Sequence, residues 1–168
     1  MSRRPKNNTE TVRKRYDRNA FVYNLMEWPL ERVRLGRWRT RLTHAVAGPR
    51  ALEVGIGTGK NLSYYPFGVS ITAIDFSRKM LAKAERKSER QARQVELLHM
   101  DVEHLNFADA SFDTVFATFV FCSVPDPVQG LKELRRVCKP DGKLLLLEHM
   151  RPDNILLGLL FDAFNTDQ

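Results

Sequence analysis

Short aliphatic strands alternate with helical segments between residues 50 and 150, and this alternation constrains the fold more than any other feature. The segments expected to be strands are residues 50–55, 69–75, 95–100, 113–120 and 143–149. Strands that alternate with helices at this spacing build a parallel sheet with helices on both faces. The sequence therefore predicts an α/β fold with five parallel strands, in which ligands bind beyond the carboxyl ends of the strands.

Local signals predict where the intervening helices begin and end. Ser77 suits the N-cap of a helix through about Arg93, and Asp126 followed by Pro127 suits the start of another. The glycine-rich turn after the first strand is expected to lead into a short helix that ends at Tyr65. The helix that begins after Asp126 is expected to bury one apolar stripe, made of Val128, Leu131, Leu134 and Cys138.

Two basic helices are expected before the sheet, one over residues 9–28 and one that follows Pro29 to about Ala47. The second should bury the stripe Leu35, Trp38, Leu42 and Ala45, with its arginines, Arg39 among them, on other faces. Residues 1–50 contain 13 Lys and Arg against 4 Asp and Glu, whereas residues 51–168 contain 14 against 16. Such a basic segment suits an anionic membrane surface, a nucleic acid or an acidic partner, or is simply a solvated helical face.

Length and composition favour one domain in the cytoplasm. The 168 residues suit a single domain, and they include no apolar run of the length that spans a membrane. The N-terminus lacks the apolar core of a secretory signal. Cys122 and Cys138 are too few for a disulfide framework, and the four histidines show no spacing typical of metal ligands. We therefore expect no metal site.

The loop after the first strand, residues 53–59 with the sequence EVGIGTG, is the most informative segment. Glycines at alternate positions let the backbone turn tightly and approach a ligand closely. The dinucleotide-binding fingerprint requires a further glycine where Lys60 stands. This difference argues against a nicotinamide-dependent oxidoreductase.

Acidic residues stand at the ends of three expected strands, namely Glu53, Asp75 and Asp101. A carboxylate at Glu53 suits an ammonium group, bound directly or through water. Asp75 is placed to accept both hydroxyls of a ribose, as the acid after the second strand does in related folds. Asp101 is placed to accept an adenine amino group, with Val102 packed on the ring. The ligand that suits all three has a cationic amino-acid end, a ribose and an adenine.

With these features in order, the sequence resembles the class I S-adenosylmethionine-dependent methyltransferases. The resemblance covers roughly residues 50–150 and rests on residues 53–59, Asp75, residues 101–103, residues 111–113 and residues 134–149. The most similar branch contains quinone-biosynthesis C-methyltransferases and bacterial phospholipid N-methyltransferases. Residues 15–18 (RYDR) and Tyr23 resemble the N-terminal helix with which that branch closes over the cofactor.

The resemblance implies a Rossmann-like sheet within a single methyltransferase domain over residues 1–168. Its parts would be an N-terminal helical cap at 1–48, a cofactor-binding core at 49–150 and the start of a C-terminal acceptor region at 151–168. The family's full sheet has two further strands, the sixth and seventh, which we expect to be missing from this chain.

The resemblance also implies S-adenosylmethionine as the cofactor and S-adenosylhomocysteine as the product. The residues expected to bind the cofactor are Tyr16, Glu53, Gly55, Gly57, Gly59, Asp75, Phe76, Met80, Asp101, Val102, Thr118 and Phe119. Tyr23 and Cys122 are expected at the acceptor, and His149, at the end of the fifth strand, is the candidate general base. A sulfonium methyl group is already activated, so the protein has mainly to align the nucleophile and exclude water.

The acceptor is expected to be a small or lipid-like molecule, with a phospholipid amine or a quinone precursor favoured. Aromatic residues among basic side chains in the first 50 residues suit an anionic bilayer, which predicts peripheral membrane association. A nucleic-acid methyltransferase remains an alternative, although residues 121–126 lack the Asn/Asp-Pro-Pro-aromatic motif of exocyclic-amine enzymes. A cofactor-binding protein without turnover is the other alternative.

Overall fold

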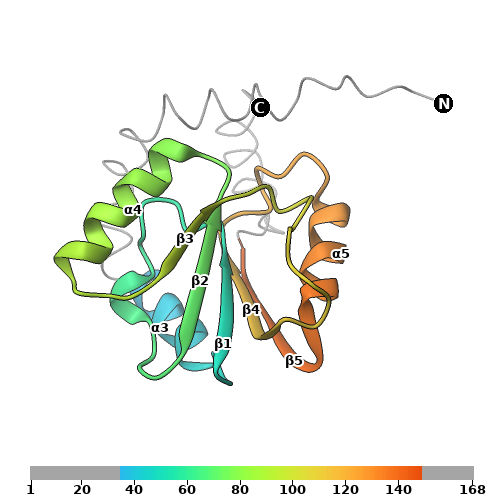
Figure 1. Ribbon diagram of the computed structural model, residues 1–168, viewed down its shortest axis with the longest axis horizontal. Helices are drawn as coiled ribbons and strands as arrows, with labels where there is room; N and C mark the ends of the chain where they lie inside the picture. Colours follow the sequence, from blue (N-terminus) through green and yellow to red (C-terminus); the bar gives the residue numbers. More distant parts are fainter. Residues whose placement is uncertain (1–34, 149–168) are drawn as a thin grey trace, which may run out of the picture.

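Five parallel strands form one sheet in the computed structural model, which describes residues 35–148 (Figure 1). The strands are β1 (Arg50–Val54), β2 (Ser70–Asp75), β3 (Glu96–His99), β4 (Phe112–Thr118) and β5 (Cys138–Leu147). Their order is β3-β2-β1-β4-β5, and every neighbouring pair is parallel. The predicted fold class is confirmed, and the order of the strands reverses between β1 and β4, where such sheets bind ligands.

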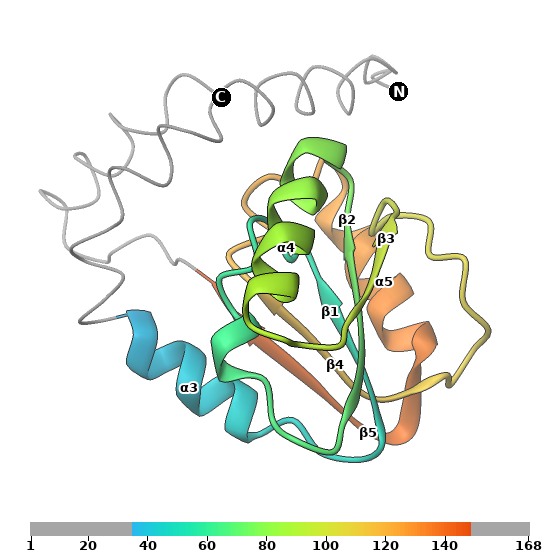
Figure 2. The same ribbon diagram turned by 60° about the vertical axis from the view of Figure 1, so that its left-hand side comes forward.

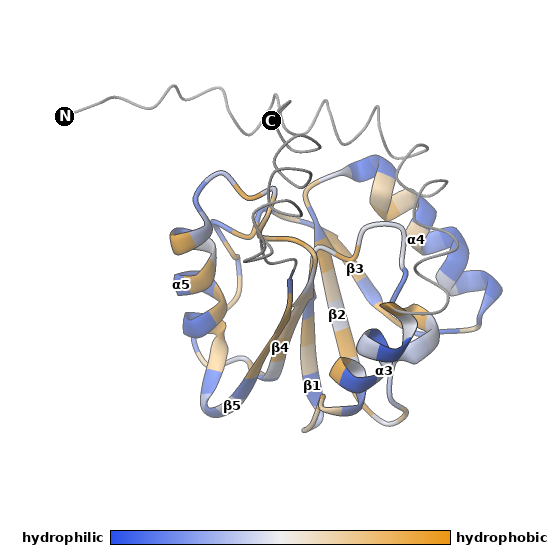
Figure 3. Ribbon diagram, turned by 180° about the vertical axis from the view of Figure 1, so that it is seen from behind, coloured by the Kyte–Doolittle hydropathy of each residue, from blue (hydrophilic) through white to orange (hydrophobic). Residues whose placement is uncertain are grey.

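Helices cover both faces of the sheet (Figure 2). The elements α3 (Gly36–His44), the 3₁₀ turn η2 (Leu62–Tyr64) and α4 (Arg78–Arg90) lie on one face, and α5 (Pro127–Val137) lies on the other. Adjacent residues of β4 face opposite ways, so that Phe116 packs in the cluster under α3 and α4 and Val115 in the cluster under α5. Burial on both sides explains the hydrophobic strands β1, β2 and β4, whereas the outer surface of α4 is hydrophilic (Figure 3).

The predicted helix starts are confirmed by their capping hydrogen bonds. Ser77 Oγ accepts a hydrogen bond from the Met80 amide at 3.3 Å, and the Asp126 carboxylate accepts one from the Gln129 amide at 3.0 Å. Helix α4 ends at Arg90 rather than Arg93, because Ala92 adopts a φ of 47°, outside the right-handed helical region. Among residues 35–148, no helix combines the length and the apolar character needed to cross a membrane. The helix predicted over residues 9–28 lies outside the described residues.

The predicted buried face of α3 is wrong at two positions. Trp38 is 50% exposed, whereas Arg39 is only 5% exposed and lies toward the sheet. A guanidinium group tolerates such burial only when its N–H groups find acceptors, and Arg39 finds them on Asn61 and Thr118. The face of α3 that lies toward the sheet therefore combines the apolar Leu42 with the buried, hydrogen-bonded Arg39.

The predicted buried face of α5 is also wrong in part. Leu134 is fully buried as expected, but Val128 is 60% exposed and Leu131 is 38% exposed. Gly130 faces the core instead, and a Cβ atom there would lie 3.1 Å from Cε1 of Phe121. Because Gly130 has no side chain, the Phe121 ring can approach the helix there. The side of α5 that contains Gly130 and Leu134 therefore faces the core.

The segment after the glycine loop is shorter than the helix predicted to end at Tyr65. Only the 3₁₀ turn η2 forms, and Tyr65 adopts an extended conformation with φ −58° and ψ 134°. Pro66 follows, and a residue before proline is disfavoured in the helical region. The extended backbone carries Tyr65 back to the sheet, where its side chain is buried.

Strand β5 begins earlier than predicted, at Cys138. Phe112 pairs with Cys138, and Thr114 pairs with Lys143, so β5 contains extra residues between these two pairs. Residues 140–142, which precede the strand predicted at 143–149, thus lie in an irregular segment inside β5.

The rotation of α5 predicts unequal costs for two truncations on that helix. Leu134→Ala should lower the free energy of unfolding by about 3 kcal/mol, because it leaves a cavity in the core. Val128→Ala should lower it by less than about 0.5 kcal/mol, because that side chain is exposed. Urea denaturation of both variants measures the difference, and equal costs would contradict the described face.

Candidate functional site

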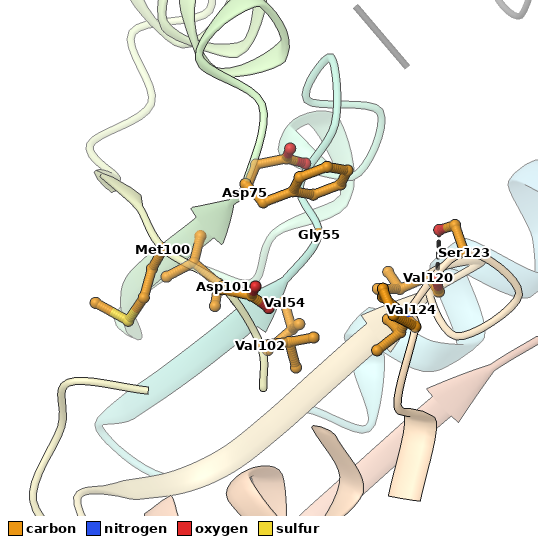
Figure 4. Close-up of a pocket in the computed structure, with 12 residues that line it drawn as sticks. Val54, Gly55, Asp75, Met100, Asp101, Val102, Val120, Ser123 and Val124 are labelled. Atoms are coloured by element: carbon orange, nitrogen blue, oxygen red, sulfur yellow. Dashed lines mark hydrogen bonds between the residues drawn. The ribbon is translucent and has the colours of Figure 1, made fainter. Parts of the chain in front are cut away.

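A pocket lies at the carboxyl ends of β1, β2 and β3, with the loop after β4 as its far wall (Figure 4). Most of its lining is apolar, and two carboxylates, Asp75 and Asp101, are its charged groups. The lining residues are Val54, Gly55, Ile74, Asp75, Phe76, Met100, Asp101, Val102, Val120, Ser123, Val124 and Pro125. The pocket therefore occupies the position that strand order alone predicts for a ligand.

The carboxylate of Asp75 joins the glycine loop to the start of α4. Its Oδ2 accepts a hydrogen bond from the Gly57 amide at 2.8 Å, and its Oδ1 accepts one from the Ser77 amide at 2.8 Å. The residue is 7% exposed and lines the pocket. An ionised carboxylate has about four acceptor positions, so such a group is able to bond to protein amides and to ligand hydroxyls together.

The three loop glycines have different structural roles, although all have positive φ angles of 57° to 76°. A Cβ atom at Gly55 would lie 2.4 Å from Val120 Cγ2, and one at Gly59 would lie 2.5 Å from Leu62 Cδ1. Both positions are thus too crowded for a side chain. A Cβ atom at Gly57 would meet nothing within 4 Å, so the backbone there borders open space that a ligand can approach.

Glu53 lies behind the glycine loop, inside the sheet, and is 1% exposed. Its Oε1 accepts a hydrogen bond from Asn61 Nδ2 at 2.6 Å, and its Oε2 accepts one from the Tyr65 hydroxyl. These side-chain donors come from η2 and its flanks, directly after the glycine loop. The predicted contact between Glu53 and an ammonium group stays untested, and in the described structure both carboxylate oxygens bond to the protein itself.

Arg39 extends this network from α3 to β4. One of its guanidinium nitrogens donates to Asn61 Oδ1 at 2.8 Å and to Thr118 Oγ1 at 3.0 Å, and Asn61 Nδ2 also donates to Thr118 Oγ1 at 3.0 Å. The guanidinium carbon lies 5.3 Å from the centre of the Phe119 ring. The Arg39–Glu53 network, defined as Arg39, Glu53, Asn61, Tyr65 and Thr118, therefore links α3, β1, the glycine loop and β4.

Burial sets the protonation of this network. Removal from water raises the pKa of Glu53 from 4.5 to about 7, against the opposing effects of the Tyr65 and Asn61 hydrogen bonds and the Arg39 charge. Burial, together with the neighbouring Glu53 carboxylate, raises the pKa of Tyr65 well above its usual 10. Tyr65 therefore remains a hydrogen-bond donor throughout the neutral range.

The structure brings part of the predicted cofactor set to the pocket. Gly55, Asp75, Phe76, Asp101 and Val102 line it. Met80 and Thr118 are buried at 7% exposure each and are not among its lining residues, and Cys122 is exposed on the loop after β4. Tyr16, Tyr23 and His149 lie outside the described residues. Within residues 35–148, no three His, Cys, Asp or Glu side chains are arranged to hold a metal ion.

Sequence reasoning missed Arg39, Asn61 and Tyr65. Arg39 is one of five arginines between residues 32 and 41, and nothing in the pattern distinguishes the buried one. Asn61 and Tyr65 follow the glycine loop closely in the sequence. Two polar side chains at that place were the one sequence signal that could have identified hydrogen-bond partners for Glu53.

Residues 52–146 match the family described as methyltransferase domain. The chain belongs to this family. It is 41% identical over 119 residues to a phosphatidylethanolamine N-methyltransferase of Cereibacter sphaeroides, a match that covers 70% of this chain and 59% of that protein. It is 32% identical over 161 residues to a ubiquinone/menaquinone biosynthesis C-methyltransferase UbiE of Geotalea uraniireducens, a match that covers 92% of this chain and 67% of that protein.

A solved structure of a SAM-dependent methyltransferase from Aquifex aeolicus has the same fold, with a TM-score of 0.63 at 23% identity. That similarity covers 87% of this chain and 75% of the other. The chain spans only 59% of the phosphatidylethanolamine N-methyltransferase and 67% of the UbiE protein. Membership confirms the resemblance to class I methyltransferases and, with it, S-adenosylmethionine as the cofactor of the family.

The pocket has the chemistry that this cofactor requires. Two carboxylates suit ribose hydroxyls and an adenine amino group, and the apolar lining suits the faces of a purine. The open space beside Gly57 allows the backbone to approach the rest of the molecule. The described residues therefore fit the family's cofactor.

The raised pKa of Glu53 predicts a pH-dependent stability. Between pH 4.5 and 7 the folded protein keeps a proton on Glu53 that the unfolded chain has lost. The stability contributed by this group is complete below pH 4.5 and decreases as the pH rises to 7, by about 3 kcal/mol in all.

Glu53→Gln removes this titration and serves as the matched variant. The free energy of unfolding of the wild type, minus that of Glu53→Gln, should fall as the pH rises from 4.5 to 7 and then stay level. Chemical denaturation across this range measures the difference. A difference that is independent of pH would contradict the protonation of buried Glu53.

Proposed function

We propose that this chain transfers a methyl group from S-adenosylmethionine to a lipid-like acceptor, with a phospholipid amine favoured and a quinone precursor as the second candidate. The observation that carries the proposal is the apolar pocket at the switch point, with Asp75 and Asp101 at the ends of two neighbouring strands. The relatives named for phosphatidylethanolamine and for ubiquinone and menaquinone support the two acceptor classes.

The residues of the pocket bind and orient the cofactor in this proposal. Asp75 accepts the ribose hydroxyls while it keeps its bonds to the Gly57 and Ser77 amides. Asp101 accepts the adenine amino group, and Val102 packs on the ring. When bound, the cofactor supplies a methyl group already activated for displacement, so the chain's own task is alignment and exclusion of water.

The acceptor side is proposed to be the loop after β4, together with residues outside the described range. Cys122 is exposed on this loop, where it can line the path of the acceptor. Tyr16 and Tyr23 are proposed to cover the cofactor and the acceptor, and His149 to accept a proton from the nucleophile. His149 follows Glu148, which is next to the carboxyl end of β5 and therefore at the same edge of the sheet as the pocket.

A membrane surface is the proposed source of the acceptor. Trp38 is half exposed on α3, and the guanidinium carbon of Arg41 lies 5.1 Å from the centre of its ring. Arg37 is also exposed on this helix, which contains no acidic residue. An aromatic side chain flanked by cations suits the headgroup region of an anionic bilayer.

Methyl transfer to vesicles tests the proposal. Anionic vesicles that contain phosphatidylethanolamine should give an N-methylated lipid, and the same vesicles with a demethylated quinone test the second candidate. Asp75→Ala should lower the rate at limiting cofactor roughly 10- to 100-fold, because charge-assisted bonds to the ribose are lost.

Asp141→Ala is the control, since Asp141 is an exposed carboxylate on β5 within its irregular segment, and its rate should match the wild type. If neither lipid acceptor is methylated but added RNA or DNA is, the result would support the nucleic-acid alternative instead. A folded protein that binds S-adenosylhomocysteine without methylating any of these acceptors would contradict the proposed acceptor class.

A further inference from the structure

The loop between β4 and α5, residues 119–126, forms the wall of the pocket opposite Asp75 and Asp101. Val120, Ser123 and Val124 of this loop line the pocket (Figure 4). The side chain of Val120 lies directly against the Cα position of Gly55, where a Cβ atom would be 2.4 Å from Val120 Cγ2. Any displacement of the loop therefore changes the width of the pocket at its contact with the glycine loop.

The loop leaves β4 through an unfavourable backbone conformation. Phe119 adopts a φ of 57°, in the left-handed region that residues with a side chain rarely occupy. The pairing of β4 with β5 ends at Thr118 and Leu147, so the amides of the residues after Phe119 need acceptors other than a strand carbonyl. Interactions from elsewhere in the fold must hold this turn in place.

Glu148 supplies those acceptors. Its Oε1 accepts hydrogen bonds from the Val120 amide at 3.0 Å and from the Phe121 amide at 3.3 Å. The Leu147 carbonyl, at the end of β5, accepts one from the Phe119 amide at 2.8 Å. The amides of Phe119, Val120 and Phe121 are therefore held by Leu147, the last residue of β5, and by Glu148, which follows it.

A second glutamate holds the other end of the loop. Glu103, from the segment after β3, accepts a hydrogen bond from the Asp126 amide at its Oε1 at 2.8 Å, and its carbonyl accepts one from Gln129 Nε2 at 3.3 Å. The Phe121 ring packs on Gly130 between these two anchors. Of the two glutamates, Glu148 is the one beside Val120 and hence beside the pocket.

We infer that Glu148 is a positioning residue for methyl transfer, whose carboxylate fixes the β4–α5 loop against the glycine loop and so sets the shape of the cofactor pocket. The identity of the ligand rests on the proposed function, whereas the role of Glu148 in holding the loop does not. Glu148 is not required to touch the cofactor or the acceptor in this account.

Two substitutions separate the hydrogen bonds from the rest of the side chain. Glu148→Ala should speed amide hydrogen exchange at Val120 and Phe121 roughly tenfold or more, because both amides lose their acceptor. It should also weaken binding of S-adenosylhomocysteine, measured by calorimetry, roughly tenfold. Glu148→Gln keeps a side-chain carbonyl acceptor and should restore both values to within about threefold of the wild type.

Asp113→Ala is the matched control, because Asp113 also accepts a backbone hydrogen bond across strands, from the Arg50 amide at 3.0 Å. It lies at the amino ends of the strands, away from the pocket, and also pairs with Lys139. Its loss should lower thermal stability without changing the affinity of the folded protein for S-adenosylhomocysteine. The same loss of affinity in both alanine variants would mean that Glu148 acts only through general stability, and would overturn the inference.

The exchange experiment decides the role of Glu148 even if the proposed function fails. A wild-type protein that does not bind S-adenosylhomocysteine would contradict the cofactor assignment alone. Unchanged exchange at Val120 and Phe121 in Glu148→Ala would overturn the inference, whatever the chain binds. Unchanged binding in Glu148→Ala with accelerated exchange would also overturn it, because the loop position would then not control the pocket.

Discussion

Glu53 lies within the sheet without access to water, so its carboxylate has to be satisfied by other side chains of the fold. Asn61 and Tyr65 provide the donors, and Arg39 reaches the same group of side chains from α3. An unsatisfied carboxylate at this depth would cost far more than one hydrogen bond gains. The path of the chain after the glycine loop suits this requirement, and burial of Arg39 on α3 suits the need of its guanidinium group for the acceptors on Asn61 and Thr118.

The acidic residues at the strand ends divide into two groups by whether they line the pocket. Glu53 faces inward and bonds to protein donors, whereas Asp75 and Asp101 line the pocket. Asp75 also accepts a hydrogen bond from the Gly57 amide inside the glycine loop, whereas Glu53 bonds to Asn61 and Tyr65, which follow the loop. The bond between Gly57 and Asp75 favours one conformation of the loop, which lowers the ordering cost of ligand binding.

The parts of the fold that depend on local pattern were predictable from the sequence, and the parts that depend on tertiary partners were not. Alternating apolar runs and turns predict the five strands, and Ser77 and Asp126 predict two helix starts. The orientation of α3 was not predictable, because an arginine looks exposed until its acceptors on distant elements are known. Likewise, the rotation of α5 depends on Phe121 contacting Gly130, and the role of Glu148 depends on the pairing of β5 with β4.

A crystal structure of the chain with S-adenosylhomocysteine tests the central claim most directly, namely that the strand ends form the cofactor site around a preformed glycine loop. We predict ribose hydroxyls within hydrogen-bond distance of Asp75, the adenine against Val102, and Glu53 still bonded to Asn61 and Tyr65. A ligand bound away from Asp75, or a Glu53 carboxylate that leaves Asn61 and Tyr65 to contact the ligand, would contradict it.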